Sequence, residues 1–86
     1  MPRPQYLLDQ MRVSKSGWGA SDLRRLYEGF GFVGKEGSKH TIYKHPLHPF
    51  LRATVARHSK LAVGYIQKAV SLIDKLRELE GVSADN

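Results

Sequence analysis

One histidine of this chain lies where a glycine turn leads into an alternating segment, between two lysines. The segment reads Gly37-Ser38-Lys39-His40-Thr41-Ile42-Tyr43-Lys44-His45-Pro46. Imidazole gains and loses a proton near pH ~6.5, so His40 can act as a base or as an acid under ordinary conditions. Lysine ammonium groups stabilise the negative charge that builds up on a phosphate during transfer reactions. Together these residue types indicate proton transfer beside a bound phosphate.

RNA suits these residues because its 2′-hydroxyl is a built-in nucleophile. A neutral imidazole can remove the hydroxyl proton, and a well-placed general base contributes roughly 10²–10⁴ in rate. We therefore predict His40 as the catalytic residue. The cations expected to stabilise the phosphate are Lys39, Lys44 and Arg57. The competing interpretation is that His40 is a partly exposed histidine at a strand end with no chemical role.

Positive charge is concentrated around this segment. The net charge of the 86-residue chain is +6, and residues 35–60 contain six Lys and Arg residues, all four histidines and one acid. Residues 61–86 contain three basic and four acidic residues. Basic charge confined to one segment favours a polyanion-binding surface, although a lysine-rich strand region without a ligand would look similar. We predict RNA binding by Lys35, Lys39, Lys44, Arg52, Arg57 and His58.

The remaining histidines give weaker signals. His45 and His48 flank prolines, and we expect both to be polar surface groups of a loop. His58 either orients RNA, supplies the acid for the leaving 5′-oxygen, or closes a turn. Tyr43 either stacks on a base or packs against its neighbours. The histidines are spaced by 5, 3 and 10 residues, which is typical of no zinc motif, and cysteine is absent. We predict no metal ion and no cofactor.

The first 19 residues are predicted to be a polar leader, partly helical or disordered. Its apolar residues could form one or two amphipathic turns: Tyr6, Leu7, Leu8 and Met11. Trp18 is expected to attach the leader to the rest of the chain. Residues 20–81 are predicted to form the folded domain, and residues 82–86 a frayed tail.

Within residues 20–81, two helices are predicted to flank three short strands. Ser21 is the expected N-cap of the first helix, whose apolar residues recur at helical spacing: Leu23, Leu26, Tyr27 and Phe30. Strands are expected at residues 32–35, 39–44 and 52–56. Pro46 and Pro49 make residues 45–51 a loop. The second helix is expected to begin near Ala62 and to end before Gly81.

This order predicts an α+β fold, α-β-β-β-α with an N-terminal extension, in which an antiparallel three-stranded sheet carries both helices on one face. The other sheet face would then be exposed to solvent and available to a ligand. The sequence shows no signal peptide and no apolar run near the ~20 residues that span a membrane. We therefore expect no membrane association and a cytoplasmic location.

The ordered set of motifs resembles the HicA toxin family, which are small bacterial endoribonucleases. The matching stretches are Trp18, Leu23-Arg24-Arg25-Leu26, Gly31-Phe32, Gly37-Ser38-Lys39-His40, Tyr43-Lys44-His45-Pro46, Thr54-Val55-Ala56-Arg57-His58 and Gly64-Tyr65-Ile66. The resemblance covers about residues 18–76, most of the chain. The resemblance implies a double-stranded-RNA-binding-like fold, a catalytic histidine at a strand start and a HicB-like antitoxin as partner.

One departure from the family pattern concerns the catalytic position. Family members usually show Gly-Ser-His, whereas residues 37–40 read Gly-Ser-Lys-His. Either Lys39 replaces the histidine or the turn contains one extra residue. Counting back from residues 43–46 places His40 at the family's catalytic position. The distinction matters because side chains alternate across a strand, and a slip of one residue changes the face. In this register His40, Ile42 and Lys44 share one face, whereas Thr41, Tyr43 and His45 share the other.

We therefore predict the toxin component of a type II toxin–antitoxin system, a metal-independent endoribonuclease that cleaves mRNA with His40 as its single catalytic histidine. The alternative is a non-catalytic, double-stranded-RNA-binding-like module that binds RNA. A third hypothesis is an interaction protein whose helices dock a partner. It predicts no affinity for nucleic acid, which the concentration of basic charge in residues 35–60 disfavours.

Overall fold

Each apolar stripe of the sequence becomes a helix, and each alternating segment becomes a strand. The computed structural model describes residues 3–81, so the expected frayed tail, residues 82–86, lies outside the described residues. The elements in chain order are α1 (Pro4–Val13), α2 (Ala20–Gly29), β1 (Val33–Glu36), β2 (His40–Lys44), β3 (Arg52–Ala56) and α3 (Val63–Leu79). The predicted α+β order is confirmed, and the bounds expected for the third strand agree with β3.

The three strands form one antiparallel sheet in the order β1-β2-β3, with β2 in the middle. Side chains of β2 alternate between the two sheet faces: Thr41 and Tyr43 are buried, whereas His40 and Lys44 are exposed and Ile42 is partly exposed. This alternation follows from the pleat of the strand. The register predicted from the sequence is therefore confirmed, and His40 lies on the outer face, away from the core.

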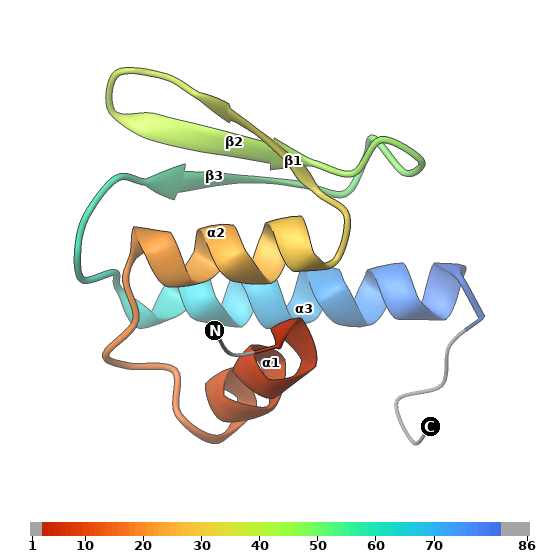
Figure 1. Cartoon of the computed structure of the whole chain (residues 1–86), viewed down its shortest axis with the longest axis horizontal. Coiled ribbons are helices and arrows are strands. Elements are labelled where there is room, and N and C mark those ends of the chain that lie inside the picture. The colour runs from red at the N-terminus through yellow and green to blue at the C-terminus, as the bar shows by residue number, and fades with distance from the viewer. Residues whose placement is uncertain (1–2, 82–86) are drawn as a thin grey trace.

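Both α2 and α3 cover the inner face of the sheet, and no element of residues 3–81 covers the outer face (Figure 1). The core fills the space between the sheet and these two helices. Tyr27 of α2 and Tyr43 of β2 are fully buried, and their rings stack with centroids 4.7 Å apart. Ile66 and Ile73 of α3 are also fully buried. Aromatic contacts of this kind stabilise a core beyond the area they remove from water.

The leader contains a helix that belongs to the same core. α1 lies on the side of α2 and α3 that faces away from the sheet, so the molecule has three layers (Figure 1). Its buried side chains are Leu7, Leu8 and Met11. The Trp18 indole N–H donates to the Ser14 carbonyl at 2.8 Å, and the Trp18 carbonyl accepts from the backbone N–H of Leu61 at 2.8 Å. Trp18 therefore connects the end of the leader to the segment before α3.

The N-terminus of α2 differs from the prediction, because Gly19 and not Ser21 is the N-cap. The Gly19 N–H donates to Asp22 Oδ2 at 2.8 Å, which satisfies the helix end from within its first turn. A Cβ at Gly19 would lie 2.1 Å from the carbonyl oxygen of Ser59, so only glycine fits here. The Ala20 N–H donates to the carbonyl of residue 58 at 2.9 Å. This contact with the end of the sheet moves the helix start upstream.

The prediction that His45 is a polar surface group is wrong. Its side chain is 5% exposed, and its ring lies edge-on to Phe32 with centroids 5.2 Å apart. The Leu47 N–H donates to His45 Nδ1 at 3.2 Å, and the His45 N–H donates to the Leu51 carbonyl at 3.1 Å. The alternation of β2 continues one residue past its end. It therefore turns His45 to the same side as Tyr43.

None of the helices within residues 3–81 has the length and apolar character needed to cross a membrane.

Candidate RNA-binding and catalytic site

His40 is the first residue of β2 and directly follows the turn from β1. The Gly37 N–H closes this turn by donating to the His40 carbonyl at 2.7 Å. A Cβ at Gly37 would lie 3.2 Å from the same oxygen, which is tighter than most side chains tolerate. Lys39 belongs to the turn, and its carbonyl accepts from the Arg57 N–H at 3.2 Å. The turn thus contains Lys39, and His40 takes the first strand position.

The exposed His40 side chain lines a shallow hollow on the outer face of the sheet. The hollow also contains Lys35, Lys39 and Ile42, and we call it the His40 hollow. Lys35 pairs with Ile42 across β1 and β2, which makes it a diagonal neighbour of His40. Such neighbours have Cα atoms about 7–8 Å apart, within reach of a long side chain. One imidazole and two ammonium groups are thereby brought to the same open surface.

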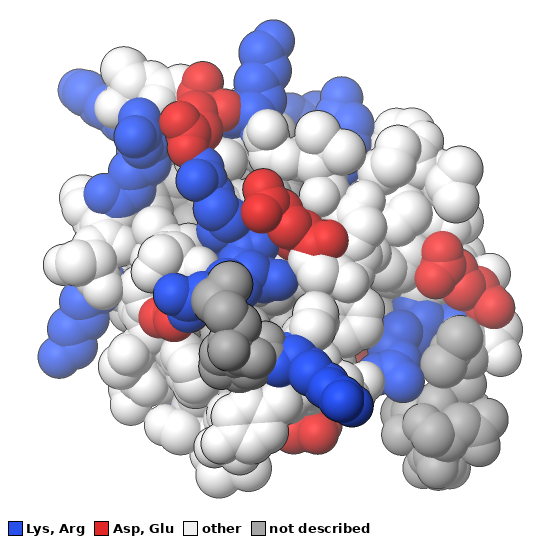
Figure 2. All heavy atoms as spheres, in the orientation of Figure 1, with Lys and Arg blue, Asp and Glu red and all other residues white. Residues whose placement is uncertain are grey.

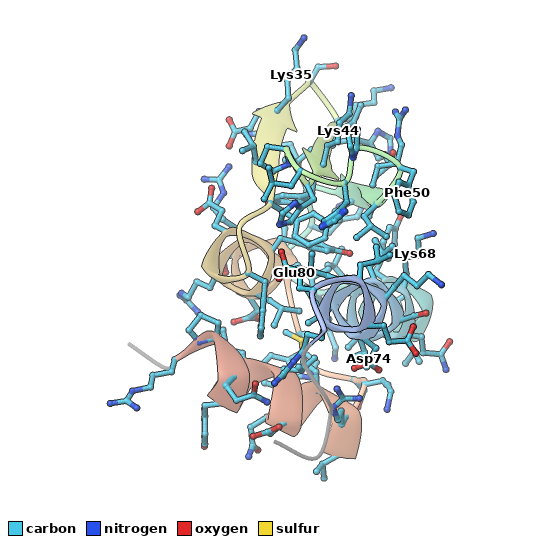
Figure 3. All side chains as sticks on the ribbon, turned by 90° about the vertical axis from the view of Figure 1, so that its right-hand side faces the viewer. Lys35, Lys44, Phe50, Lys68, Asp74 and Glu80 are labelled. Atoms are coloured by element: carbon cyan, nitrogen blue, oxygen red, sulfur yellow. The ribbon has the colours of Figure 1, made fainter. Side chains whose placement is uncertain are left out.

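Lys44 and Arg52 lie on the same outer face but at the opposite end of the sheet. They are directly opposed residues of β2 and β3, and both are exposed. Figure 3 shows the Lys35 and Lys44 side chains pointing away from the helices. At about 3.4 Å per residue, the Cα of Lys44 lies roughly 14 Å from that of His40. These two cations are therefore too far away to contact the phosphate beside His40, but they can contact another phosphate of the same bound RNA molecule.

Arg57 and His58 lie in a second hollow, and the structure does not bring them into the His40 hollow. We call this second one the Arg24 hollow; its lining includes Ser21, Arg24, Glu36, Thr41, Arg57 and His58. Thr41 faces the helices, so the two hollows open on opposite sides of the β1–β2 hairpin. Glu36 borders both of them.

The side chain of Arg57 supports the turn that precedes His40. Its Nη1 donates to the Gly37 carbonyl at 2.9 Å, in addition to the backbone contact with Lys39. The sequence predicts that the Arg57 guanidinium stabilises the phosphate beside His40. In this arrangement it instead holds the turn from the inner side of the hairpin. The His58 carbonyl accepts a hydrogen bond from the backbone N–H of Ala20, the first residue of α2. This contact agrees with the alternative in which His58 closes a turn.

Sequence reasoning missed Arg24 and Glu36 as members of a charged site. Arg24 of α2 forms an ion pair with Glu36 at the end of β1. The hydrogen bond from Arg24, its charge, and the further charge of Arg57 lower the pKa of Glu36 below its ordinary value of 4.5. The same hydrogen bond raises the pKa of Arg24. In the sequence, Arg24 is one of two adjacent arginines in a predicted helix. Its spacing from Glu36 is not typical of any contact, so the pair could not be predicted.

The other side chains considered from the sequence play structural parts. Tyr43 packs on Tyr27, so its ring is not available to stack on a base. The rings of His45 and His48 are neighbours with centroids 5.3 Å apart, and His48 Nε2 lies 3.8 Å from Glu80 Oε2. Over residues 3–81 no cluster of three or more His, Cys, Asp or Glu side chains could hold a metal ion.

Basic side chains are not confined to the sheet. Figure 2 shows Lys and Arg side chains projecting from the part of the molecule that contains the sheet, and further ones over the helices. Acidic atoms lie among them. What distinguishes the His40 hollow is therefore the combination of an exposed imidazole with two lysines, rather than positive charge alone.

Comparisons with protein-family models, with curated proteins and with solved structures found no match to this chain. Its function must therefore be inferred from its own side chains and from how the fold arranges them.

Proposed function

We propose that this chain is the toxin component of a type II toxin–antitoxin system, an endoribonuclease that cleaves mRNA in the cytoplasm without a metal ion. The observation that carries the proposal is the exposed imidazole of His40 beside Lys35 and Lys39 on the uncovered face of the sheet. A buried or laterally blocked ring could not reach an RNA strand. The resemblance of the chain's motifs to the HicA family supports the same function.

In the proposed reaction, neutral His40 removes the proton of a ribose 2′-hydroxyl. The resulting oxygen attacks the adjacent phosphorus, the bond to the 5′-oxygen breaks, and a 2′,3′-cyclic phosphate remains. The leaving oxygen takes its proton from the imidazolium or from water. Lys35 and Lys39 stabilise the additional negative charge on the phosphate, since both line the hollow that contains His40. Lys44 and Arg52 bind phosphates of the RNA further along the sheet.

A double-stranded-RNA-binding-like identity for the segment from α2 to α3 is part of this proposal. The order α-β-β-β-α and the position of both helices on one sheet face support it. We further propose a HicB-like antitoxin as the protein partner. An inhibitor of this kind would cover the outer sheet face and block access to His40.

The decisive test is cleavage of a single-stranded mRNA fragment by His40→Ala in the presence of EDTA. Loss of the general base should lower the cleavage rate by about 10²–10⁴, while the circular dichroism spectrum stays that of the parent because His40 is exposed. His48→Ala is the matched control, since this histidine lies outside both hollows. Equal cleavage by His40→Ala and the parent would refute the assignment.

A non-catalytic RNA-binding module is the second candidate. It is favoured by one observation: among residues 3–81, no hydrogen bond orients the His40 imidazole. Such a module would shift RNA in a gel and leave it intact with EDTA present. Its affinity would fall with salt, with a logarithmic slope of about −0.7 for each phosphate contacted on a single strand. Intact, shifted RNA would therefore select this function over cleavage.

A further inference from the structure

The Arg24 hollow has the composition of an anion-binding site, and the proposed cleavage at His40 does not use it. It lies on the inner side of the β1–β2 hairpin, between the start of α2 and the end of β3. Three basic residues line it: Arg24, Arg57 and His58. Residues with hydroxyl groups complete the lining: Ser21, Thr41, Tyr43 and Ser59. Guanidinium and hydroxyl donors together are suited to a phosphate.

A protein carboxylate already occupies part of this cationic surface. Glu36 pairs with Arg24, and the charge of Arg57 also acts on it. The side chains of Arg24 and Glu36 are each 47% exposed, so solvent screens the pair and makes it weak. A dianionic phosphate can form two parallel hydrogen bonds with a guanidinium and carries more charge than a carboxylate. It could therefore displace Glu36 from Arg24.

A second feature of the hollow is independent of the ion pair. Thr41 is only 6% exposed, yet it lines the hollow. Within residues 3–81 its hydroxyl makes no hydrogen bond with the protein, and it is not one of the fully buried polar atoms, so it remains open to solvent. A hydroxyl is both a donor and an acceptor, and this one is not committed to a protein partner. It can therefore donate to a phosphate oxygen in the hollow.

We propose that the Arg24 hollow is a phosphate-binding site in which Glu36 holds the place of the ligand until a phosphate displaces it. Arg24 and Thr41 bind the phosphate, and His58 adds a donor at the rim. Because Arg57 connects this hollow to the turn before His40, an RNA strand could contact both sides of the hairpin. Only the choice of RNA as the source of the phosphate rests on the proposed function.

The test is a titration with inorganic phosphate at constant ionic strength, followed by the backbone amide resonances of Thr41 and His58. Glu36→Gln removes the competing carboxylate and frees Arg24, and it should tighten phosphate binding about three- to tenfold. Asp74→Asn is the matched control, because it also removes one negative charge. It frees Arg12 from an ion pair between α1 and α3. Asp74 lies on the α1 side of the molecule, far from the sheet and Lys35 (Figure 3). Asp74→Asn should leave the affinity measured at Thr41 unchanged.

A double variant, Glu36→Gln with Arg24→Gln, should return the affinity to the parent's value or below it. This result would show that the freed guanidinium is the ligand. Equal affinity for Glu36→Gln and Asp74→Asn would overturn the proposal. So would resonance shifts that stay confined to Lys39 and His40 while Thr41 and His58 do not respond.

The source of the phosphate is tested with oligodeoxynucleotides, which lack the 2′-hydroxyl and cannot be cleaved by the proposed reaction. Shifts at Thr41 with an unphosphorylated strand identify a phosphodiester as ligand. Shifts only with a 5′-phosphorylated strand or inorganic phosphate identify a terminal or free phosphate. Both results support the site and are independent of catalysis, so failure of His40→Ala to abolish cleavage would leave this proposal standing.

Discussion

The two faces of the sheet differ sharply even though the same strand supplies both. On the inner face of β2, Tyr43 is 2% exposed and stacks on Tyr27 of α2. On the outer face, the preceding residue Ile42 is partly exposed and the following residue Lys44 is exposed. We therefore expect the buried inner face to provide most of the stability of the sheet. The exposed outer face should contribute little, which leaves its residues free to serve binding and chemistry.

The β1–β2 hairpin contributes residues to the hollows on both faces of the sheet. Its turn positions His40 on the outer side, and the last residue of β1, Glu36, borders hollows on both sides. Arg57 holds the turn from the inner side through the Gly37 carbonyl. Function is therefore expected at the hairpin end of the sheet, where polar groups from both faces can reach one ligand.

Substitution at Tyr43 should have the largest effect on stability. Tyr43→Ala removes a buried ring and leaves a cavity beside Tyr27, and we expect it to lower the free energy of unfolding by about 3–5 kcal/mol. The neighbouring Lys44→Ala should change it by less than about 0.5 kcal/mol. Urea denaturation followed by circular dichroism measures both. Similar losses for the two variants would show that the faces do not divide stability from function in this way.

Leu8 tests whether the third layer is part of the same core. Its side chain is fully buried beneath α2 and α3, so Leu8→Ala should lower the free energy of unfolding by about 2–5 kcal/mol. Val13 of the same helix is 85% exposed, and Val13→Ala serves as the control with a negligible effect. A single cooperative urea transition is expected for the parent. If Leu8→Ala left the midpoint unchanged, α1 would have to be an appendage rather than a layer of the core.

Much of the fold could be predicted from the sequence because its signals are local. The bounds of β3, the alternation of β2 and the apolar face of α2 each follow from the spacing of residues that are close in the chain. The errors concern contacts with distant residues. Ser21 is a good N-cap residue by type, but the close approach of the Ser59 backbone, which is distant in the chain, favours glycine at position 19. The burial of α1 depends likewise on helices that lie later in the chain.

The candidate site was predictable only in part. The exposure of His40 and its face followed from the alternation within β2. The same alternation places His45 on the face of Tyr43, and this signal, rather than the position of His45 in a loop, agrees with the buried ring. The separation of Arg57 and His58 from His40 could not be inferred, because it depends on how the chain turns after β3. Arg24 of α2 pairs with Glu36 of β1, and the spacing of these residues in the sequence does not predict this contact.

The smallest expected effect is the contribution of Glu36 to stability at low pH. Its pKa is lowered in the folded chain by Arg24 and Arg57, so ionised Glu36 stabilises the fold above its unfolded pKa of 4.5, and this is lost as the pH falls through the folded pKa. The parent should therefore lose more stability than Glu36→Gln between pH ~5 and pH ~3, by a small margin because solvent screens the pair. Urea midpoints across that range measure the difference.

Glu28→Gln is the control, because within residues 3–81 Glu28 makes no ion pair. Identical pH profiles for the parent and Glu36→Gln would show that Arg24 does not hold Glu36 in solution. The Arg24 hollow would then lack the ion pair that a phosphate is proposed to displace.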